Sequence, residues 1–338
     1  MSVILTCNAG STNIKFAIFD AQTLERTGHA LTYSPSDSTA WLCSMGTKGL
    51  SAIGYRVVHG GQEFIQPVMI TDDIIDKLRA YITLAPLHQP AVLSLVAEAR
   101  KLYPTLPHIA CFDTAFHQTM TEAERRFPLP RRFHDKGIMR YGFHGLSYQH
   151  IADILPEFAG EKAKGRIIVA HLGGGSSACA MKNFQSVATT MGFSTLDGMM
   201  MDTRCGALDP GVILYLLTEK KMSATEVSDL LYYESGLKGV SGISGNMEEL
   251  LESKSATAQE AVVLYCTLAA KQIAALVPTL GGLDAIVFTG GIGEHATLVR
   301  DRIVELLRWI GYFPVYVIAA DEEIVIAKAC QKISRALM

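Results

Sequence analysis

One pattern occurs twice in this chain of 338 residues and limits how it can fold: an apolar run, a turn rich in Gly and Ser, and a second apolar run. The first copy spans residues 3–19 with its turn at 8–13, and the second spans residues 166–181 with its turn at 172–177. Each copy is typical of two antiparallel strands joined by a polar turn. The repetition predicts two structurally related halves, and the chain is long enough for two domains.

Strand and helix patterns alternate along the rest of the chain, which predicts α/β layers. A Pro-rich and basic stretch at 122–140 favours a loop or lid over a core element. Further strands are expected at 53–58, 109–112, 284–289 and 315–319, and helices at 72–80, 91–102, 212–217, 224–233, 257–277, from the Gly turn at 290–293 through Trp309, and from about Asp321 to the end.

Composition narrows the class of protein. Hydrophobic residues make up 49% and charged residues 19%, which excludes a disordered chain. The net charge of −3 implies no strongly basic face, so nucleic acid is not expected as the main partner. Seven dispersed cysteines without a CxxC pair indicate reduced thiols and a cytoplasmic location. Because prolines interrupt the longest uncharged stretch, 80–97, we expect no membrane-spanning segment, and we read no targeting peptide at the start.

Three glycine-rich loops follow apolar strands. Residues 8–15 offer backbone amides, hydroxyls and a lysine, a set that suits a phosphate but also an ordinary hairpin turn. Residues 171–177 hold three consecutive glycines, which are costly in entropy unless a ligand must approach the backbone. Residues 289–295 open a helix, where a GGxG turn is weak support by itself. Jointly the three loops predict a nucleotide held between two domains.

Charged side chains in apolar surroundings are the candidates for the reaction site. Arg56 lies inside an apolar strand and Arg204 beside a Gly turn, so each needs an anion, whether a substrate or a structural salt-bridge partner. His144 lies between glycines and aromatics, where a core histidine is the alternative. Asp113 ends a strand, a position that suits an active site or a helix N-cap.

A hard cation fits this chain better than zinc. No His or Cys pair has the spacing of a zinc site, so oxygen ligands and Mg²⁺ are expected beside phosphates. Glu322 and Glu323 follow the last strand and are candidate ligands, with a solvated helix start as the alternative.

Nine segments in order resemble the acetate kinase family, and the resemblance runs almost end to end. It implies an α/β fold of the actin-like (ribonuclease H-like) ATPase type, with an interdomain nucleotide cleft between residues 1–117 plus 322–338 and residues 118–321. It also implies phosphorylation of a short-chain carboxylate by ATP with Mg²⁺, Mn²⁺ being the alternative, usually in a homodimer. The segments are 8–12, 56–61, 85–88, 112–117, 141–145, 171–173, 203–206, 235–245 and 290–294.

The resemblance also implies roles for individual residues. Asp113 resembles the residue assigned as the acid/base, but a carboxylic acid with a pKa of roughly 4–5 is already ionised at neutral pH. We therefore expect Asp113 to orient an arginine or a metal-bound water. By the same resemblance, Asn8 and Glu322 are metal ligands, with Glu323 as the alternative to Glu322, and Arg56 binds the substrate carboxylate.

The resemblance further implies that Val58, Leu87 and Phe143 surround the alkyl group, and that His144 and Arg204 contact the phosphoryl group. The residues it implies for nucleotide binding are Lys15, His171, Leu172, Gly173, Gly174, Gly175, Asn246, Met247, Glu248, Gly291, Ile292, Gly293, Glu294 and His295.

The sequence departs from the family pattern at five of these or neighbouring positions. Glu248 stands where an arginine usually packs on adenine, so weaker ATP selectivity, another nucleoside triphosphate or another phosphoryl donor stays open. The other departures are Asn13 for Ser or Thr, Gly174 for Asn, Asp202 for Gly, and Thr195 for a proline near the alkyl pocket. The change at Thr195 leaves propionate or another small acid open as acceptor.

Two other interpretations compete with a carboxylate kinase: a sugar or polyol kinase, and a non-enzymatic nucleotide-binding module.

Overall fold

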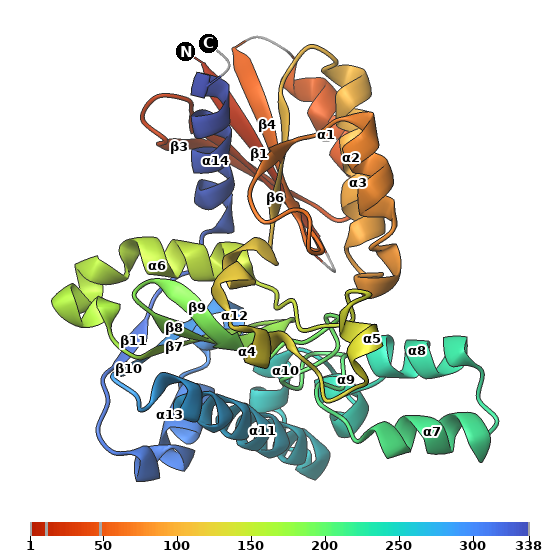
Figure 1. Ribbon diagram of the computed structural model, residues 1–338, viewed down its shortest axis with the longest axis vertical. Coiled ribbons are helices and arrows are strands. Elements are labelled where there is room, and N and C mark those ends of the chain that lie inside the picture. Colours follow the sequence, from red (N-terminus) through yellow and green to blue (C-terminus); the bar gives the residue numbers. More distant parts are fainter. Residues whose placement is uncertain (1, 11–12, 47–48, 337–338) are drawn as a thin grey trace. The chain divides into compact units, whose positions relative to one another are not determined.

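The computed structural model describes residues 2–10, 13–46 and 49–336, and the chain divides into two compact units (Figure 1). Unit 1 comprises Met1–Gln118, Phe143–His150 and Asp321–Met338, and unit 2 comprises Thr119–Gly142 and Ile151–Ala320. The expected boundaries are each off by one residue, since Gln118 and Asp321 belong to unit 1. A larger difference is the segment Phe143–His150, which was expected in the second domain and belongs to unit 1. This segment carries Phe143 and His144 into unit 1.

Unit 1 is built on a six-stranded sheet with the order β3-β2-β1-β4-β6-β5. The three central strands, β1, β4 and β6, are parallel, while β2, β3 and β5 run antiparallel to their neighbours. The first predicted hairpin is thus present. The strands are β1 (Val3–Ala9), β2 (Ile14–Asp20), β3 (Arg26–Thr32), β4 (Leu50–Val57), β5 (Val68–Met69) and β6 (His108–Phe112).

Helices cover both faces of this sheet (Figure 1). One face packs on α1 (Pro35–Met45), α2 (Asp72–Arg79) and α3 (Gln89–Leu102), and the other on α14 (Glu322–Ala336). Helix α14 approaches closely because β4 carries Gly54, where a Cβ atom would lie 2.4 Å from Cγ2 of Ile326. This approach brings the first turn of α14 to the sheet.

Unit 2 repeats the same strand arrangement. Its sheet has the order β11-β10-β7-β8-β9, with β7, β10 and β11 parallel and β8 and β9 antiparallel. The order β9-β8-β7-β10-β11 therefore corresponds to β3-β2-β1-β4-β6 of unit 1, which confirms the two related halves. The strands are β7 (Ile167–Leu172), β8 (Ser176–Lys182), β9 (Gln185–Thr189), β10 (Ala285–Thr289) and β11 (Val315–Val317).

Helix α11 (Ala256–Leu280) forms the core of unit 2 by packing across β7, β8 and β9. Within the described residues it is the one helix long and apolar enough to cross a membrane. Its buried residues, among them Tyr265 and Ile273, contribute to the hydrophobic core, as expected for a core helix. The other helices outside the cover of the first sheet are α4 (Glu122–Arg125), α5 (Arg131–His134), α6 (Gly145–Ala159), α7 (Pro210–Thr218), α8 (Ala224–Tyr233), α9 (Gly236–Ser241), α10 (Met247–Glu252), α12 (Gly290–His295) and α13 (Thr297–Leu306).

Three predicted elements differ from the structure. Pro90 lies in the first turn of α3 instead of before the helix, because that turn leaves its backbone amides unpaired and tolerates proline. The predicted helix through Trp309 is broken at Ala296, which separates α12 from α13. The predicted loop at 122–140 contains α4 and α5, two helices of one turn each.

Candidate functional site

Arg56 and Asp113 pair at the carboxyl ends of two adjacent parallel strands. Arg56 lies on β4 and Asp113 directly follows β6. Nε of Arg56 donates to Oδ1 and Oδ2 of Asp113 at 3.0 and 3.1 Å, and Nη2 donates to Oδ2 at 2.7 Å. This two-point pairing fixes the plane of the guanidinium. The carboxyl ends of parallel strands are also where ligands bind in open α/β sheets.

The other side of the same guanidinium contacts β1 and α14. Nη1 of Arg56 donates to Oδ1 of Asn8 at 3.1 Å and to Oε2 of Glu322 at 3.0 Å. Nδ2 of Asn8 in turn donates to Glu322 at 2.7 Å and to Glu323 at 2.8 Å. We call Asn8, Arg56, Asp113, Glu322 and Glu323 the arginine cluster. All five are buried, so strands β1, β4 and β6 and helix α14 converge on one enclosed polar network.

Negative charge is in excess in the arginine cluster, with three carboxylates against one guanidinium. Burial alone would lower the pKa of Arg56, but the facing charges of Asp113 and Glu322 raise it, so Arg56 stays charged. Burial raises the pKa of Asp113 to about 6, against the lowering effect of Arg56. Burial and the neighbouring Glu322 also raise the pKa of Glu323. The net negative charge of the cluster would therefore favour binding of a cation.

The donor set of the cluster fits a hard divalent cation. Carboxylate oxygens of Glu322 and Glu323 and the amide oxygen of Asn8 are ligands of the kind that Mg²⁺ takes. Among the described residues, no group of three or more His, Cys, Asp or Glu is arranged to hold a metal ion. A Mg²⁺ ion here would therefore need further ligands from water or phosphate, as is usual for this ion.

The segment with His144 is held against Asp113 by backbone contacts. His144 adopts a left-handed conformation with φ 58, and its backbone amide donates to the Asp113 carboxylate. A Cβ atom at Gly145 would lie 1.9 Å from the Asp113 carbonyl oxygen, so only glycine fits there. Nε2 of His117 donates to the carbonyl of Phe143 at 2.9 Å. The strained residue is thus fixed on both sides, which is common at functional sites.

The residues expected to form the alkyl wall lie in unit 1, beside two aromatic rings to which no sequence motif assigned a role. Val58 and Phe143 are buried, and Leu87 is half-buried. The ring of His59 contacts Phe143 edge-on at 5.4 Å and stacks on Tyr81 at 5.0 Å.

Arg204 lies in unit 2 and is 3% exposed. Its Nη1 donates to the carbonyl of Thr195 at 2.9 Å. Thr195, one of the departures from the family pattern, thus holds the arginine by its backbone.

Unit 2 contains a cavity of about 980 Å³ between the glycine loop after β7 and helices α10 and α12. We call it the glycine-lined cavity. Eight predicted nucleotide residues line it: Gly173, Gly174, Asn246, Met247, Glu248, Gly291, Ile292 and His295. The structure adds five that were not predicted: Asp202, Gly245, Leu251, Glu252 and Ala296.

Other predicted nucleotide residues do not line this cavity. Leu172 and Gly293 are buried, Gly293 against β7 and β10. Glu294 accepts hydrogen bonds from the backbone amides of Gly290 and Ala320 at 2.9 Å each, which ties down the start of α12. His171 and Gly175 flank the lining glycines, and Lys15 is exposed on β2 of unit 1.

Two departures from the family pattern explain each other. A Cβ atom at Gly174 would lie 3.1 Å from Oδ2 of Asp202, and the Asp202 side chain also packs against Gly245. A small residue at 174 thus leaves the space that the larger residue at 202 fills. Because Asp202 is largely buried, its pKa is raised, and its carboxylate lines the cavity beside the glycine loop.

A buried hydrogen-bond network supports the glycine loop from below. Oγ of Ser176 donates to the carbonyl of Gly173 at 3.0 Å and lies 2.9 Å from the hydroxyl of Tyr265 on α11. Ser176 and Tyr265 are almost fully buried. No local sequence pattern marks this network, because 89 residues separate the two hydroxyls.

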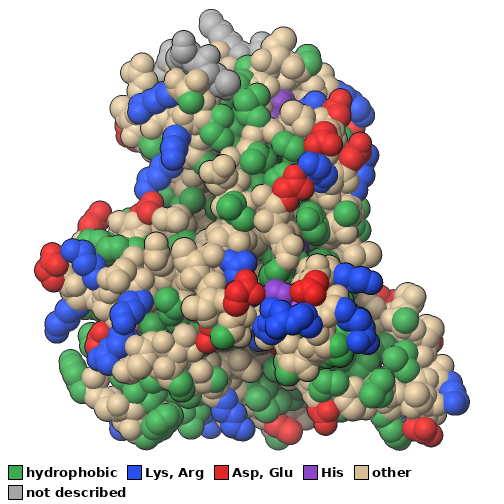
Figure 2. Space-filling view, viewed as in Figure 1, with side chains coloured by type: hydrophobic (Ala, Val, Ile, Leu, Met, Phe, Trp, Pro, Cys, Tyr) green, Lys and Arg blue, Asp and Glu red, His purple; other side chains and the backbone are tan. Residues whose placement is uncertain are grey.

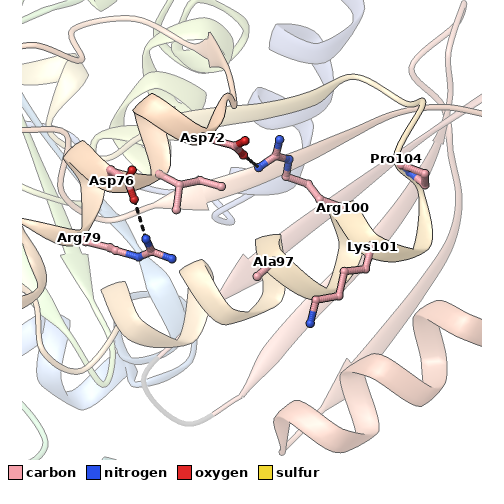
Figure 3. A pocket seen from close by; sticks show the side chains of 8 residues that line it. Asp72, Asp76, Arg79, Ala97, Arg100, Lys101 and Pro104 are labelled. Atoms are coloured by element: carbon pink, nitrogen blue, oxygen red, sulfur yellow. Dashed lines mark hydrogen bonds and ion pairs between the residues drawn. The ribbon is translucent and has the colours of Figure 1, made fainter.

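A second hollow, of about 430 Å³, lies on the surface between α2 and α3 (Figure 3). Arg79 pairs with Asp76 and Arg100 with Asp72, at 2.6 Å each. Its arginines thus already have anionic partners, and no predicted site residue lines it. We do not consider it the reaction site.

Comparison with known proteins agrees with this geometry. The chain matches the model of the Acetokinase family over residues 36–330. An acetate kinase from Rhodopseudomonas palustris is 48% identical over 346 residues, covering 91% of this chain and 87% of that protein. A solved propionate kinase from Francisella tularensis subsp. tularensis has a TM-score of 0.91 at 32% identity, covering 98% of this chain and all (100%) of that one.

A solved acetate kinase from Porphyromonas gingivalis has a TM-score of 0.86 at 29% identity, covering 98% of this chain and 100% of that one. These likenesses confirm the expected two-domain, actin-like fold. They also confirm the resemblance drawn from the sequence motifs. The chain therefore belongs to the acetokinase family, whose members are phosphotransferases that act on a carboxylate acceptor.

Proposed function

We propose that this cytoplasmic enzyme transfers the γ-phosphoryl group of ATP reversibly and in line to acetate, forming acetyl phosphate and ADP. Propionate or another small acid is the alternative acceptor, and another nucleoside triphosphate is the alternative donor. The observation that carries the proposal is the buried guanidinium of Arg56, held in one orientation by Asp113. A carboxylate is the natural ligand of such a planar donor group. A sugar kinase would instead need a base for a hydroxyl group.

Arg56 has a donor left for a substrate. Asp113 takes Nε–H and one N–H of Nη2, while Asn8 and Glu322 take those of Nη1. The second N–H of Nη2 therefore has no acceptor among the described residues. We assign it to the substrate carboxylate, with Val58, Leu87 and Phe143 around the alkyl group.

Asp113 orients Arg56 in this proposal and removes no proton. The acceptor is already ionised at neutral pH, since its pKa is roughly 4–5. Its attack on phosphorus needs positive charge around the phosphoryl oxygens and a fixed direction of approach. Arg56, His144 and Arg204 supply the charge and hydrogen bonds, and the glycine-lined cavity takes the nucleotide.

Mg²⁺ is proposed at Asn8 and Glu322, with Mn²⁺ as the alternative. When bound, the ion would neutralise phosphate charge during transfer. This assignment follows the surplus of negative charge in the arginine cluster and its oxygen ligands. Glu323 shares the hydrogen bond of Asn8 and supports the position of that amide.

A homodimer is proposed through α7 and α8 of unit 2. Helix α7 has no buried residue although nearly all of its side chains are apolar, and hydrophobic side chains gather at the surface over these helices (Figure 2). Such exposure marks an interface in a soluble protein. The exposed large residues are Leu208, Val212, Leu214, Tyr215 and Tyr233. Light scattering should give twice the chain mass for the wild type and a smaller mass for Leu214→Lys.

The reaction is tested by trapping acyl phosphate as a hydroxamate, with acetate, propionate and butyrate crossed against ATP, GTP and pyrophosphate. Product with a short-chain acid and a nucleoside triphosphate supports the proposal. No product under any pairing would favour a nucleotide-binding module without catalysis.

A further inference from the structure

The glycine-lined cavity has an unusual charge for a site that receives a polyphosphate. None of the described residues that line it is Lys or Arg, and three of them, Asp202, Glu248 and Glu252, are carboxylates. Its apolar lining comes from Leu251 on α10 and from Ile292 and Ala296 at α12. A flat apolar base fits between such walls. The polar edge of a base bound there would face carboxylates and no Lys or Arg of the described lining.

Of these carboxylates, Glu248 lies in the first turn of α10. Its backbone is fixed because Oδ1 of Asn246, the N-cap of α10, accepts its amide hydrogen at 2.8 Å. The buried side chains of Met247 and Leu250 anchor the same helix in the core. The Glu248 carboxylate is exposed and forms no hydrogen bond or ion pair with any described residue. It is therefore an available acceptor on a fixed wall.

A carboxylate distinguishes the purine bases by their edges. Guanine presents two adjacent donors, N1–H and the N2 amino group, which match the two oxygens of a carboxylate. Adenine presents one amino donor beside the lone pair of N1, which a carboxylate repels. A glutamate facing this edge thus favours guanine through two hydrogen bonds and disfavours adenine through one repulsive contact.

We propose that Glu248 makes this enzyme select guanine nucleotides, so that GTP is the preferred phosphoryl donor and GDP the preferred acceptor in reverse. This inference rests on the proposed function of the cavity as the nucleotide site. Hypoxanthine keeps N1–H but lacks the amino group, so ITP should fall between GTP and ATP.

The test measures kcat/KM for GTP, ITP and ATP with saturating acetate and Mg²⁺, and measures binding of GDP, IDP and ADP by calorimetry. We expect GTP to exceed ATP at least about tenfold, with ITP between them. Glu248→Gln should shrink the ratio to about threefold or less. Glu249→Gln is the matched control, because Glu249 is its exposed neighbour outside the cavity lining, and it should keep the ratio.

Measuring both turnover and nucleotide binding distinguishes a failure of the guanine preference from a failure of the proposed reaction. ATP equal to or better than GTP, in turnover or binding, would overturn the guanine preference while leaving a carboxylate kinase. An unchanged ratio in Glu248→Gln would also overturn it. GDP bound at least tenfold more tightly than ADP, but without acetyl phosphate from any nucleotide, would support the preference and reject the proposed reaction.

Discussion

The arginine cluster of unit 1 and the glycine-lined cavity of unit 2 are organised in opposite ways. In the cluster the guanidinium and its carboxylates are buried and hold one another. In the cavity, glycine backbone and helix ends form the walls, and the Glu248 carboxylate has no hydrogen-bond or ion-pair partner among the described residues. Side chains that hold one another are hard to change without loss, whereas an open wall can be changed residue by residue. Catalysis should therefore break most readily in unit 1, and specificity should shift most readily in unit 2.

The largest effect is expected for Arg56→Ala. It removes the proposed carboxylate ligand and leaves three buried carboxylates without their cation, so kcat/KM for acetate should fall about a thousandfold or more. The free energy of unfolding should also fall by about 3–5 kcal/mol. Arg79→Ala, on the exposed face of α2, is the control and should change neither quantity measurably. Equal activity in both variants would contradict the assignment.

Arg204→Ala should cost more turnover than Asp113→Asn. Loss of an arginine that stabilises a transferring phosphoryl group costs about a thousandfold or more, whereas Asp113 acts through Arg56 and should cost about ten- to a hundredfold. Hydroxamate assays over a range of pH measure both. If Asp113→Asn is as inactive as Arg204→Ala and loses a limb of the pH profile, Asp113 moves a proton and the orienting role is wrong.

Asp113 should also make stability depend on pH. Its pKa rises from 3.8 to about 6 in the folded protein, so the folded state holds the proton more tightly than the unfolded state. The resulting stabilisation is complete below pH 3.8 and is lost as the pH rises through about 6, amounting to at most about 3 kcal/mol. Urea unfolding at several pH values should show this decline in wild type and a weaker one in Asp113→Asn. The same slope in both would exclude Asp113 as its source, and Mg²⁺ should reduce the decline.

The smallest expected effect is on the KM for nucleotide, when the side-chain sizes at positions 174 and 202 are exchanged. Gly174→Asn alone should raise the KM for nucleotide about fivefold, because its side chain meets Asp202. Asp202→Gly together with Gly174→Asn should relieve the crowding and restore or lower that KM. Additive effects of the two substitutions would show that the residues do not compete for space.

Local patterns predicted much of the fold. Both hairpins follow from apolar runs around polar turns, and Arg56 and Asp113 stood out because charge is rare in or directly after a buried strand. The meeting of Asn8 with Glu322 could not be derived locally, since 314 residues separate them, and it was expected only from the family resemblance. It depends on the close approach of α14 to Gly54.

Other parts of the site depend on packing that no local pattern records. The segment Phe143–His150 joins unit 1 because Gly145 lets the chain approach Asp113, which a sequence motif alone does not show. Asp202 enters the cavity only because residue 174 is a glycine. Tyr265 lies in a helix whose apolar pattern gives no sign of the hydroxyl contact with Ser176.

The central claim is that a fixed Arg56 directs phosphoryl transfer to a carboxylate. Phosphorus-31 NMR of the enzyme with acetate, Mg²⁺ and either GTP or ATP tests it most directly. The account predicts a growing acetyl phosphate signal matched by nucleoside diphosphate, which disappears in Arg56→Ala and persists in Arg79→Ala. Release of inorganic phosphate without acetyl phosphate, or an equal signal in Arg56→Ala, would contradict it.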